Sequence, residues 1–250
     1  MELPIKINNL QRIDEWINID DLEKKYHSKQ WFIEKRSTVV FETFCKHKVE
    51  NSNNIIDLGS GSGAPTYYFA KKNNKVFFTG CDISQELIEI GISKLKEAAI
   101  DNLKFKKSDW FNLDYFNDID GVISLQTISW MPEFETPFLE IFTKVNPKWI
   151  ALTSLFYEGN ISAITEINEH TRNRKSFYNT YSLKEIDRFC RKYGYYISKA
   201  IPFNIDIDLP KSKDDDLMST YTHYIGELDR RIQLCGPIIM NWKMIMIERI

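Results

Sequence analysis

The stretch that most constrains the fold is a glycine-rich loop between an apolar strand and a helix. Residues 54–63 read Asn-Ile-Ile-Asp-Leu-Gly-Ser-Gly-Ser-Gly, and Ala64-Pro65 then opens the expected helix, where proline suits the first turn. Glycine allows a sharp turn and a close approach of a ligand, because it has no Cβ and tolerates positive φ. The helix behind the loop directs its free N–H groups toward the loop. The sequence therefore predicts a cradle for an anionic or nucleoside-bearing small molecule.

The loop is compatible with more than one ligand. Gly59, Gly61 and Ala64 fit the dinucleotide fingerprint G-x-G-x-x-(G/A), and a tight strand–helix turn without a ligand is a further alternative. Asp57 stands two residues before the first glycine, and Asp-x-Gly-x-Gly-x-Gly resembles the first motif of the class I S-adenosylmethionine (SAM) methyltransferases. The resemblance implies that Asp57 holds the amino end of SAM, above a loop whose cofactor-binding residues are Gly59, Ser60, Gly61 and Gly63.

A second motif follows about one αβ unit later. The β-rich run at 76–81 ends in Asp82-Ile83-Ser84. An acid at the end of the second strand of such units can accept hydrogen bonds from ribose hydroxyls. Asp82 is therefore expected to bind the ribose, with Ile83 beside it. The alternative is a helix cap, for which Ser84 is the better residue.

Two further signals occur in the order that the resemblance requires. The strand expected at 103–108 leads into Asp109 and Trp110, and the resemblance implies that they contact the adenine amino group and ring. Beyond the strand expected at 121–126, Gln126 and Trp130 are the candidates for the wall beside the sulfonium and the acceptor. Both tryptophans can equally be core aromatics.

The composition is that of an ordinary globular domain. The chain has 250 residues, 43% of them apolar, and a net charge of −2, which gives no electrostatic footprint for nucleic acid. No apolar run approaches a membrane span, the amino terminus lacks a secretion signal, and four scattered cysteines indicate reduced thiols. We expect a single cytoplasmic domain over residues 1–250, without a metal, a nucleic-acid partner or a membrane contact. The oligomeric state stays open.

Apolar periodicity predicts an α/β fold. Strands are expected near 54–59, 76–82, 103–108, 121–126 and 149–157, and helices near 64–73, 84–99, 133–145 and 182–193. This alternation predicts a doubly wound, Rossmann-like parallel sheet. A helical cap is expected within 1–50. Strand-like runs at 195–207, 219–226, 231–235 and 238–248 predict extended C-terminal β hairpins, and the family resemblance implies an antiparallel strand pair at the sheet's end.

Two segments, 158–181 and 203–240, are expected to shape the substrate pocket. The first follows the fifth strand, at the carboxyl edge where ligands bind in open αβ folds. Its basic and aromatic residues suit a phosphate or carboxylate, although solvated arginines on an exposed charged helix are the alternative. Residues from the N-terminal helix are expected to close over the acceptor. The substrate-binding candidates are thus Tyr26, Trp31, Arg36, Trp130, Arg172, Arg174, Tyr178 and Tyr181.

Methyl transfer requires alignment of the nucleophile, methyl group and sulfur, and a base only when the nucleophile is a hydroxyl. The sequence offers His170, His223 and Glu158 as candidate catalytic residues. Methyltransferases that act on amide or base nitrogens usually carry an Asn/Asp-Pro-Pro-Tyr loop after the fourth strand. This chain has Ser-Leu-Gln-Thr at 124–127, which argues against such substrates.

The long C-terminal tail, which contains Gly236-Pro237 and Asn241-Trp242, resembles small bacterial methyltransferases of surface-polysaccharide (capsule) modification. The implied activity is methylation of oxygen or nitrogen on a small anionic metabolite, such as a sugar or phosphorylated precursor, with SAM as cofactor. One alternative is a short-chain NAD(P)-dependent oxidoreductase, which needs a helical Tyr-x-x-x-Lys late in the domain. Tyr195 and Lys199 have that spacing but fall on an expected strand. The other alternative is a SAM-binding protein without catalysis.

Overall fold

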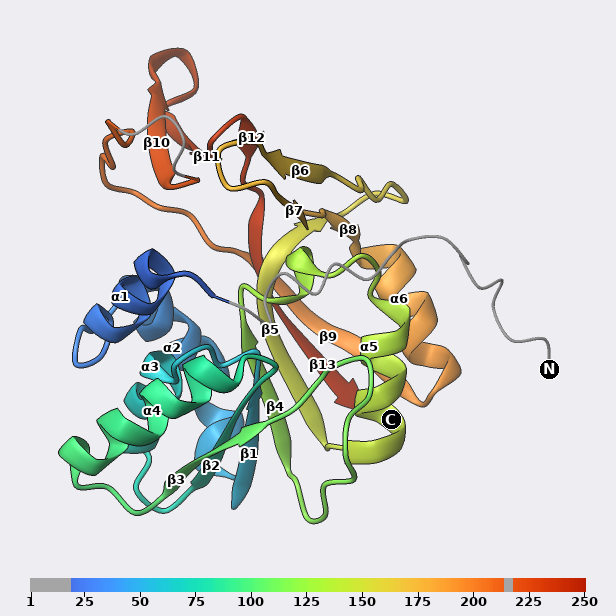
Figure 1. Ribbon diagram of the computed structural model, residues 1–250. Helices are drawn as coiled ribbons and strands as arrows, with labels where there is room; N and C mark the ends of the chain where they lie inside the picture. Colours follow the sequence, from blue (N-terminus) through green and yellow to red (C-terminus); the bar gives the residue numbers. More distant parts are fainter. Residues whose placement is uncertain (1–18, 214–217) are drawn as a thin grey trace.

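The computed structural model describes residues 19–213 and 218–250, and its centre is one eight-stranded sheet (Figure 1). The strand order is β3-β2-β1-β4-β5-β13-β9, with β8 paired to β5. The parallel strands are β1 (Asn54–Leu58), β2 (Phe77–Asp82), β3 (Leu103–Lys107), β4 (Gly121–Leu125), β5 (Trp149–Tyr157) and β8 (Tyr181–Ser182). Strands β9 (Tyr195–Pro202) and β13 (Trp242–Arg249) form the antiparallel end. The predicted α/β Rossmann-like fold is confirmed.

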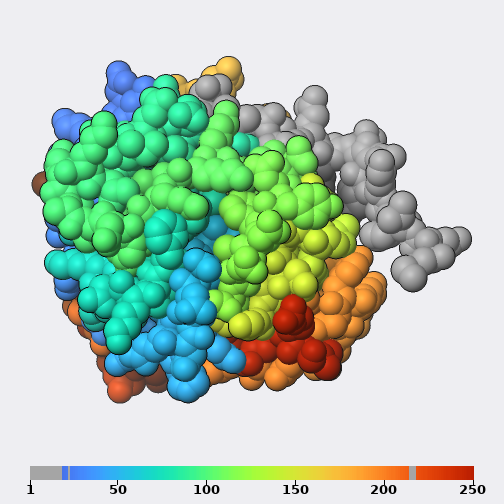
Figure 2. Space-filling view, turned by 90° about the horizontal axis from the view of Figure 1, so that it is seen from below, coloured from blue at the N-terminus to red at the C-terminus, as the bar shows by residue number. Residues whose placement is uncertain are grey.

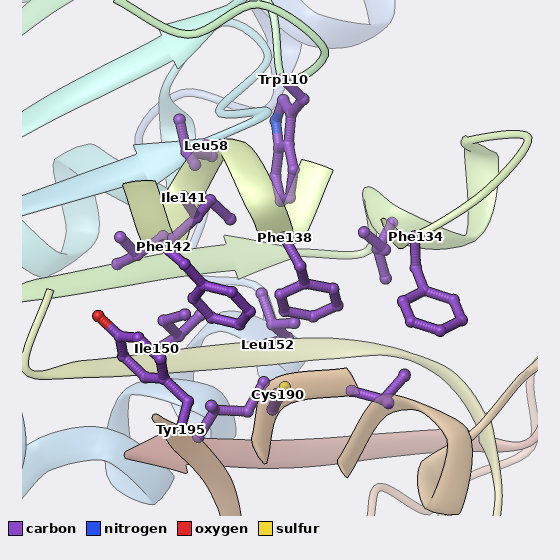
Figure 3. Packing of buried hydrophobic residues seen from close by; sticks show 14 of the residues in the cluster. Leu58, Trp110, Phe134, Phe138, Ile141, Phe142, Ile150, Leu152, Cys190 and Tyr195 are labelled. Carbon is purple, nitrogen blue, oxygen red and sulfur yellow. The ribbon is translucent and has the colours of Figure 1, made fainter. Parts of the chain in front are cut away.

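Helices cover both faces of the sheet (Figure 1). One face carries α2 (Arg36–Glu50), α3 (Ala64–Lys72) and α4 (Gln85–Ala98). The other carries α5 (Glu135–Glu140), which continues as the π-helix η3 (Ile141–Val145), and α6 (Leu183–Lys192). Neighbouring strand residues point to opposite faces. Ile55 therefore packs against the core under α2 and α3, and Ile56 against the aromatic core under α5 and α6 that Figure 3 shows.

The amino edge of the parallel strands is closed by polar contacts around Asp120. Its carboxylate accepts hydrogen bonds from the N–H of Asn53 at 2.7 Å and from Lys148 at 2.7 Å. The N–H of Arg249 bonds the carbonyl of Lys148 at 3.0 Å. Figure 2 views the molecule from this end, where the blue, yellow and red segments lie side by side. These contacts hold the amino ends of β1, β4 and β5 and the end of β13 together at this edge.

Four elaborations surround the carboxyl edge (Figure 1). The helix α1 (Asp21–Lys29) precedes α2, and the 3₁₀ turn η2 (Ile128–Trp130) follows β4. A hairpin of β6 (Glu166–Glu169) and β7 (Arg174–Phe177) follows β5. The small sheet of β10 (Thr220–Ile225), β11 (Arg230–Cys235) and β12 (Ile238–Ile239), with the turn η4 (Gly226–Leu228), precedes β13.

Several element boundaries differ from the sequence expectations. The segment 158–181 forms a β-hairpin where a charged helix was the alternative, and the strand expected at 195–207 ends at Pro202. The run expected at 238–248 divides between β12 and β13. The part of the expected cap at 1–18, and 214–217 within the second pocket segment, lie outside the described residues. Within the described ranges, no helix has the length and apolar character that a membrane crossing requires.

Candidate cofactor and acceptor site

A cavity of about 410 Å³ lies at the carboxyl edge of the sheet. The glycine loop, the ends of β2 and β4, and the turn after β3 line one part of it. The end of α1, the start of α2, Tyr178 and residues from β10, β11 and β13 line the rest. The volume lies within the usual range of ligand pockets, roughly 300–1,000 Å³. The cavity is therefore the candidate functional site.

The glycine loop follows β1 in a left-handed backbone. The φ angles of Gly59, Gly61 and Gly63 are 73°, 58° and 85°. The N–H groups of Gly59 and Ser60 donate to the carbonyl of Cys81 at 2.8 and 2.9 Å, which ties the loop to β2. Gly59, Ser60 and Gly61 line the cavity as expected. Gly63 does not; it is the N-cap of α3, where a Cβ would lie 2.1 Å from Phe105.

Asp57 places a buried carboxylate beneath the loop. Its Oδ2 atom accepts a hydrogen bond from the Thr66 hydroxyl at 2.6 Å. Its Oδ1 atom has no hydrogen-bond partner among the described residues, although the side chain is only 1% exposed. Burial raises the pKa of Asp57 to about 7. An unsatisfied buried oxygen that lines a cavity suits a ligand that brings a hydrogen-bond donor, above all a cationic one.

Asp82 closes the loop from the end of β2. Its Oδ2 atom accepts from the N–H of Gly61 at 2.8 Å, and its Oδ1 atom accepts from the N–H of Ser84 at 2.9 Å. Burial raises the pKa of Asp82 in spite of these bonds. Ser84, and not Asp82, caps α4 by accepting from the N–H of Leu87. Asp82 lines the cavity while it makes these contacts.

The turn after β3 supplies another wall of the cavity. Asp109, Trp110 and Phe111 line it together with Ile83 and Leu87. The Asp109 carboxylate accepts from the N–H of Phe111 at 3.0 Å. Trp110 also packs in the core that Figure 3 shows, so this residue both belongs to the core and lines the cavity. The Trp110 Nε1 atom is buried and has no partner among the described residues.

The loop after β4 forms an aromatic wall. Gln126 lines the cavity in a left-handed conformation, with φ 61°, which is uncommon for a residue other than glycine. Strain of this kind clusters at functional sites. Trp130 stacks on Tyr178 with ring centroids 4.2 Å apart, and both rings line the cavity. Tyr178, which directly follows β7, therefore forms this wall together with Trp130 from the loop after β4.

The last turn of α1 lies against the glycine loop. The Ser62 hydroxyl donates to the carbonyl of His27 at 3.2 Å, and the Trp31 indole donates to the carbonyl of Ser62 at 2.9 Å. His27 lines the cavity next to the glycine loop. A Cβ added to Gly61 would lie 3.2 Å from the His27 imidazole. Burial, and next the charge of Lys35, lower the pKa of His27 to about 4. The imidazole is therefore neutral at pH 7.

None of the three candidate catalytic residues lines the cavity. His170 and His223 are exposed, the first on the turn between β6 and β7 and the second on β10. Glu158 is exposed just after β5 and forms an ion pair with Lys243, which lowers the pKa of the carboxyl. Spacing along the chain gave no indication of these side-chain directions. Among the described histidines it is His27 that lines the cavity.

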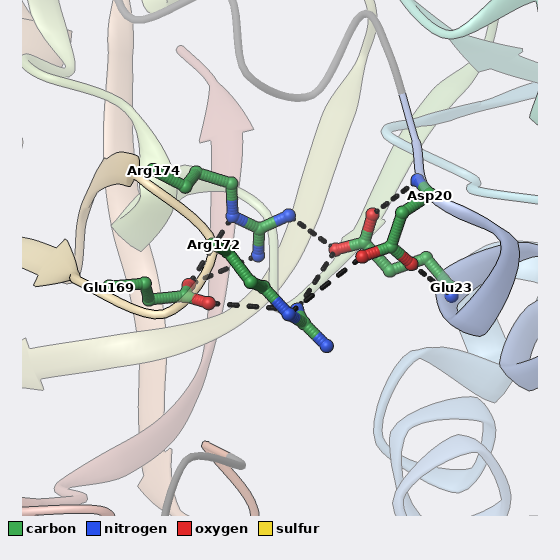
Figure 4. Close-up of polar contacts among 5 residues, drawn as sticks. All are labelled: Asp20, Glu23, Glu169, Arg172 and Arg174. Carbon is green, nitrogen blue, oxygen red and sulfur yellow. Dashed lines mark hydrogen bonds and ion pairs between the residues drawn. The ribbon is translucent and has the colours of Figure 1, made fainter.

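Arg172 and Arg174 are engaged with carboxylates and do not line the cavity (Figure 4). Arg174 contacts Glu23 of α1 at 2.5 Å and Glu169 of β6 at 3.1 Å. Arg172 lies 3.6 Å from Glu169 and 3.8 Å from Asp20. These contacts connect the β6–β7 hairpin to α1. The sequence analysis expected the two arginines to bind the acceptor, and the structure instead pairs them with carboxylates outside the cavity.

Three other substrate candidates also lie outside the cavity. Trp31 is buried against α3 and the glycine loop, and Arg36 pairs with Asp206 at 2.5 Å on the surface. The Tyr181 hydroxyl donates to the carbonyl of Met131 at 2.6 Å and so supports the loop after β4. Tyr26 lines the cavity as expected.

The cluster of Figure 4 predicts a large loss of stability for Arg174→Met. The change leaves the largely buried carboxylates of Glu23 and Glu169, 15% and 14% exposed, without this partner. We expect the free energy of unfolding to fall by about 1–3 kcal/mol in thermal or urea denaturation. Arg191→Met is the matched control, because that side chain is 56% exposed in its pair with Asp187. Equal losses in both variants would contradict the cluster's role.

Sequence reasoning missed several lining residues at the end of α1, at the start of α2, after β4 and in the C-terminal strands. They include Gln30, Lys35, Ser37, Thr38, Thr127, Met218, Thr220, Cys235 and Trp242. One signal was available for the α2 residues. A helix that runs directly into the first strand must begin at the carboxyl edge of the sheet. The others come from elements whose placement depends on distant contacts.

Comparison with known proteins identifies the family. A methyltransferase domain family matches residues 50–218, which is more than half of the chain. Malonyl-acyl-carrier-protein O-methyltransferase of Priestia megaterium is 23% identical over 145 residues, 55% of this chain and 52% of that protein. The chain spans about half the length, or less, of the first curated relatives it matches.

Solved structures share the fold at low sequence identity. The (4+2)-cyclase SpnF superposes with a TM-score of 0.59 at 17% identity, covering 88% of this chain and 86% of that one. Magnesium protoporphyrin IX methyltransferase of Synechocystis, solved with bound S-adenosylhomocysteine (SAH), gives 0.55 at 12% identity, covering 93% and 89%. The strand order, the glycine loop and the family match agree, and the chain belongs to this family of methyltransferase domains.

Proposed function

We propose that this protein transfers a methyl group from SAM to oxygen or nitrogen of a small-molecule acceptor. The observation that carries the proposal is the pairing of an unsatisfied Asp57 Oδ1 atom with a left-handed glycine loop in one cavity. SAM brings an ammonium group that fits such an oxygen, whereas the pyrophosphate of a dinucleotide would be repelled by it. The family match supports this reading over the oxidoreductase alternative.

The residues that would hold SAM follow from the cavity lining. Asp57 would accept from its ammonium group, Asp82 from its ribose hydroxyls, and Asp109 with Trp110 would contact the adenine. Bound SAM supplies an electrophilic methyl group on a sulfonium, and the leaving thioether is neutral. The protein therefore has to position the acceptor and exclude water. Trp130 and Tyr178 form the aromatic wall that would do so.

His27 takes the place that the sequence analysis gave to His170, His223 and Glu158. It lines the cavity and is neutral, so it can accept a hydrogen bond from an acceptor hydroxyl or amine. A pKa of about 4 makes it a weak base, which suits orientation of the nucleophile more than removal of its proton. Acceptors that are already anionic, as carboxylates and phosphates are, would need no base.

The acceptor class is the finer part of the proposal. The resemblance of the C-terminal part to enzymes of surface-polysaccharide modification favours a sugar or a phosphorylated precursor. The test incubates the purified protein with SAM carrying a deuterated methyl group and a panel of nucleotide sugars, sugar phosphates and small carboxylic acids. Mass spectrometry should find one product that carries the labelled methyl group. SAH binding without any labelled product across the panel would favour the non-catalytic SAM-binding alternative.

A further inference from the structure

The acids of the cavity come from one half of the sheet edge. Asp57 and Asp82 lie near the ends of β1 and β2, and Asp109 follows β3. These three strands are neighbours in the strand order β3-β2-β1-β4-β5-β13. The carboxylates therefore line the cavity over the half of the sheet that would hold SAM.

The other half of the edge contributes apolar side chains. Trp242, at the start of β13, pairs with Leu155 near the carboxyl end of β5. The segment after β7 leads into β8, which also pairs with β5. The apolar lining residues from these segments, from the loop after β4 and from the small C-terminal sheet with its approach are Trp130, Tyr178, Met218, Cys235 and Trp242. We call these five residues the apolar side of the cavity.

The apolar side is continuous with the protein core. Tyr178, Cys235 and Trp242 are buried in one hydrophobic cluster, and Trp130 and Met218 pack against that cluster. Aromatic side chains present large flat faces, and methionine adapts its shape to a ligand. A ligand that covers these faces gains the free energy of apolar burial. The apolar side is therefore suited to a ring.

The charges of the lining disfavour an anion. Among the described residues that line the cavity, Lys35 alone is positively charged at pH 7, against the three carboxylates. The Lys35 ammonium lies 5.1 Å from the ring centroid of Tyr26, which is 58% exposed, so this cation belongs to the rim. A phosphate or carboxylate inside the cavity would be repelled by the acids and would lose its hydration against apolar side chains.

The polar side chains that α1 and its C-cap add to the cavity are neutral. The His27 imidazole lines it in the neutral form. Gln30 also lines it, and its Nε2 atom is buried with no hydrogen-bond partner among the described residues. The imidazole can accept a hydrogen bond and the amide can donate one. A hydroxyl or an amine, which both donates and accepts, matches this pair.

We propose that the acceptor enters the cavity as an uncharged ring, which packs on the apolar side and carries the hydroxyl or amine that receives the methyl group. The inference rests on the proposed function and narrows its acceptor class, since any charged group of the acceptor stays outside the cavity. The ring oxygen or nitrogen substituent forms a bond to the methyl carbon as the bond from that carbon to sulfur breaks. The bonding electron pair stays on sulfur, and the proton of the hydroxyl or amine passes to solvent.

The test titrates the SAH-saturated protein with two pairs of probes, each a neutral ring and its phosphate. The pairs are phenol with 4-hydroxyphenyl phosphate, and methyl glucoside with methyl glucoside 6-phosphate. In ligand-observed NMR, the neutral probe of at least one pair should bind roughly 10-fold or more tightly than its phosphate. The pair that binds identifies the ring as aromatic or as a sugar.

A phosphate that binds as tightly as its neutral partner, or more tightly, would overturn the inference. Failure of all four probes to bind the SAH-saturated protein would overturn it too and leave the proposed function standing. A protein that does not bind SAH would overturn the proposed function, and this inference with it.

Two lysine substitutions test the apolar side itself. Met218→Lys places an ammonium there at a partly buried position, and Ile239→Lys is the matched control on β12, outside the cavity and 65% exposed. Met218→Lys should shift the preference toward the phosphate probes roughly 10-fold or more, and Ile239→Lys should not change it. A Met218→Lys protein that folds by circular dichroism and keeps the wild-type preference would contradict the assignment.

Discussion

Replacement of Asp57 by asparagine should weaken SAH binding roughly 10- to 100-fold, the loss expected when a hydrogen bond to a charged group is removed. The asparagine keeps the size of the side chain and an oxygen that can accept from the Thr66 hydroxyl. What disappears is the negative charge beside the unsatisfied Oδ1 position. Isothermal calorimetry at pH 8 measures the difference directly.

The same substitution should not destabilise the ligand-free protein. Burial raises the pKa of Asp57 from 3.8 to about 7, so between these values the folded state binds more protons than the unfolded state. The contribution of Asp57 to the free energy of unfolding therefore falls as pH rises through this window. At pH 8 the buried Asp57 carboxylate is charged and has only the Thr66 hydroxyl as a hydrogen-bond partner among the described residues, and Asp57→Asn removes this charge. We expect a melting temperature equal to or above that of wild type.

The pH dependence of binding follows from the same pKa. SAH affinity of wild type should rise between pH 6 and 8 as Asp57 ionises, and that of Asp57→Asn should stay flatter. Asp120→Asn is the opposite control at the amino edge, where hydrogen bonds and Lys148 lower the pKa of Asp120. It should lose stability and keep SAH affinity. An Asp57→Asn protein that binds SAH like wild type would remove Asp57 from the site.

Gly59→Ala should lower SAH affinity by at least 100-fold or prevent folding. Gly59 has φ 73°, and an added Cβ would lie 2.4 Å from the side chain of Thr127. The left-handed backbone alone costs an alanine about 1–2 kcal/mol. In addition, the contact with Thr127 would displace the loop after β4, and this loop carries Gln126 and Trp130 of the cavity wall.

Gly194→Ala is the control that separates the cost of the left-handed backbone from the cost of the contact with Thr127. Gly194 has φ 79°, and a Cβ there would meet no atom within 4 Å. It should lose about 1–2 kcal/mol of stability and retain SAH binding. If Gly59→Ala still folds, as circular dichroism would report, its SAH affinity should be at least 100-fold lower than that of wild type. Equal stability and affinity for both variants would contradict the close packing of the glycine loop against Thr127.

The sheet and the wall of the cavity formed by the glycine loop and the strand ends could be predicted, because their signals in the sequence are local. Asp57, Gly59, Gly61 and Asp82 lie at strand ends that an apolar run and a turn mark in the sequence. Parallel strands bring these ends to one edge, so chain order alone placed them together.

The rest of the cavity and the hairpin beside it depend on contacts between distant segments. From the sequence, Arg174 was a candidate for binding an anion, because its partner Glu23 lies about 150 residues away and nothing local shows that α1 meets the hairpin. Thr38 falls among the buried positions of α2, and helical periodicity cannot distinguish a core threonine from one that faces a cavity. His27 was overlooked for the same reason, because its role depends on how α1 lies against the glycine loop.

The measurement that tests the central claim most directly is calorimetry of the wild-type protein with SAM, SAH, NAD and NADP. The cavity with its unsatisfied Asp57 oxygen predicts one site for SAM and SAH and no binding of either dinucleotide. Binding of NAD or NADP without binding of SAM or SAH would contradict it.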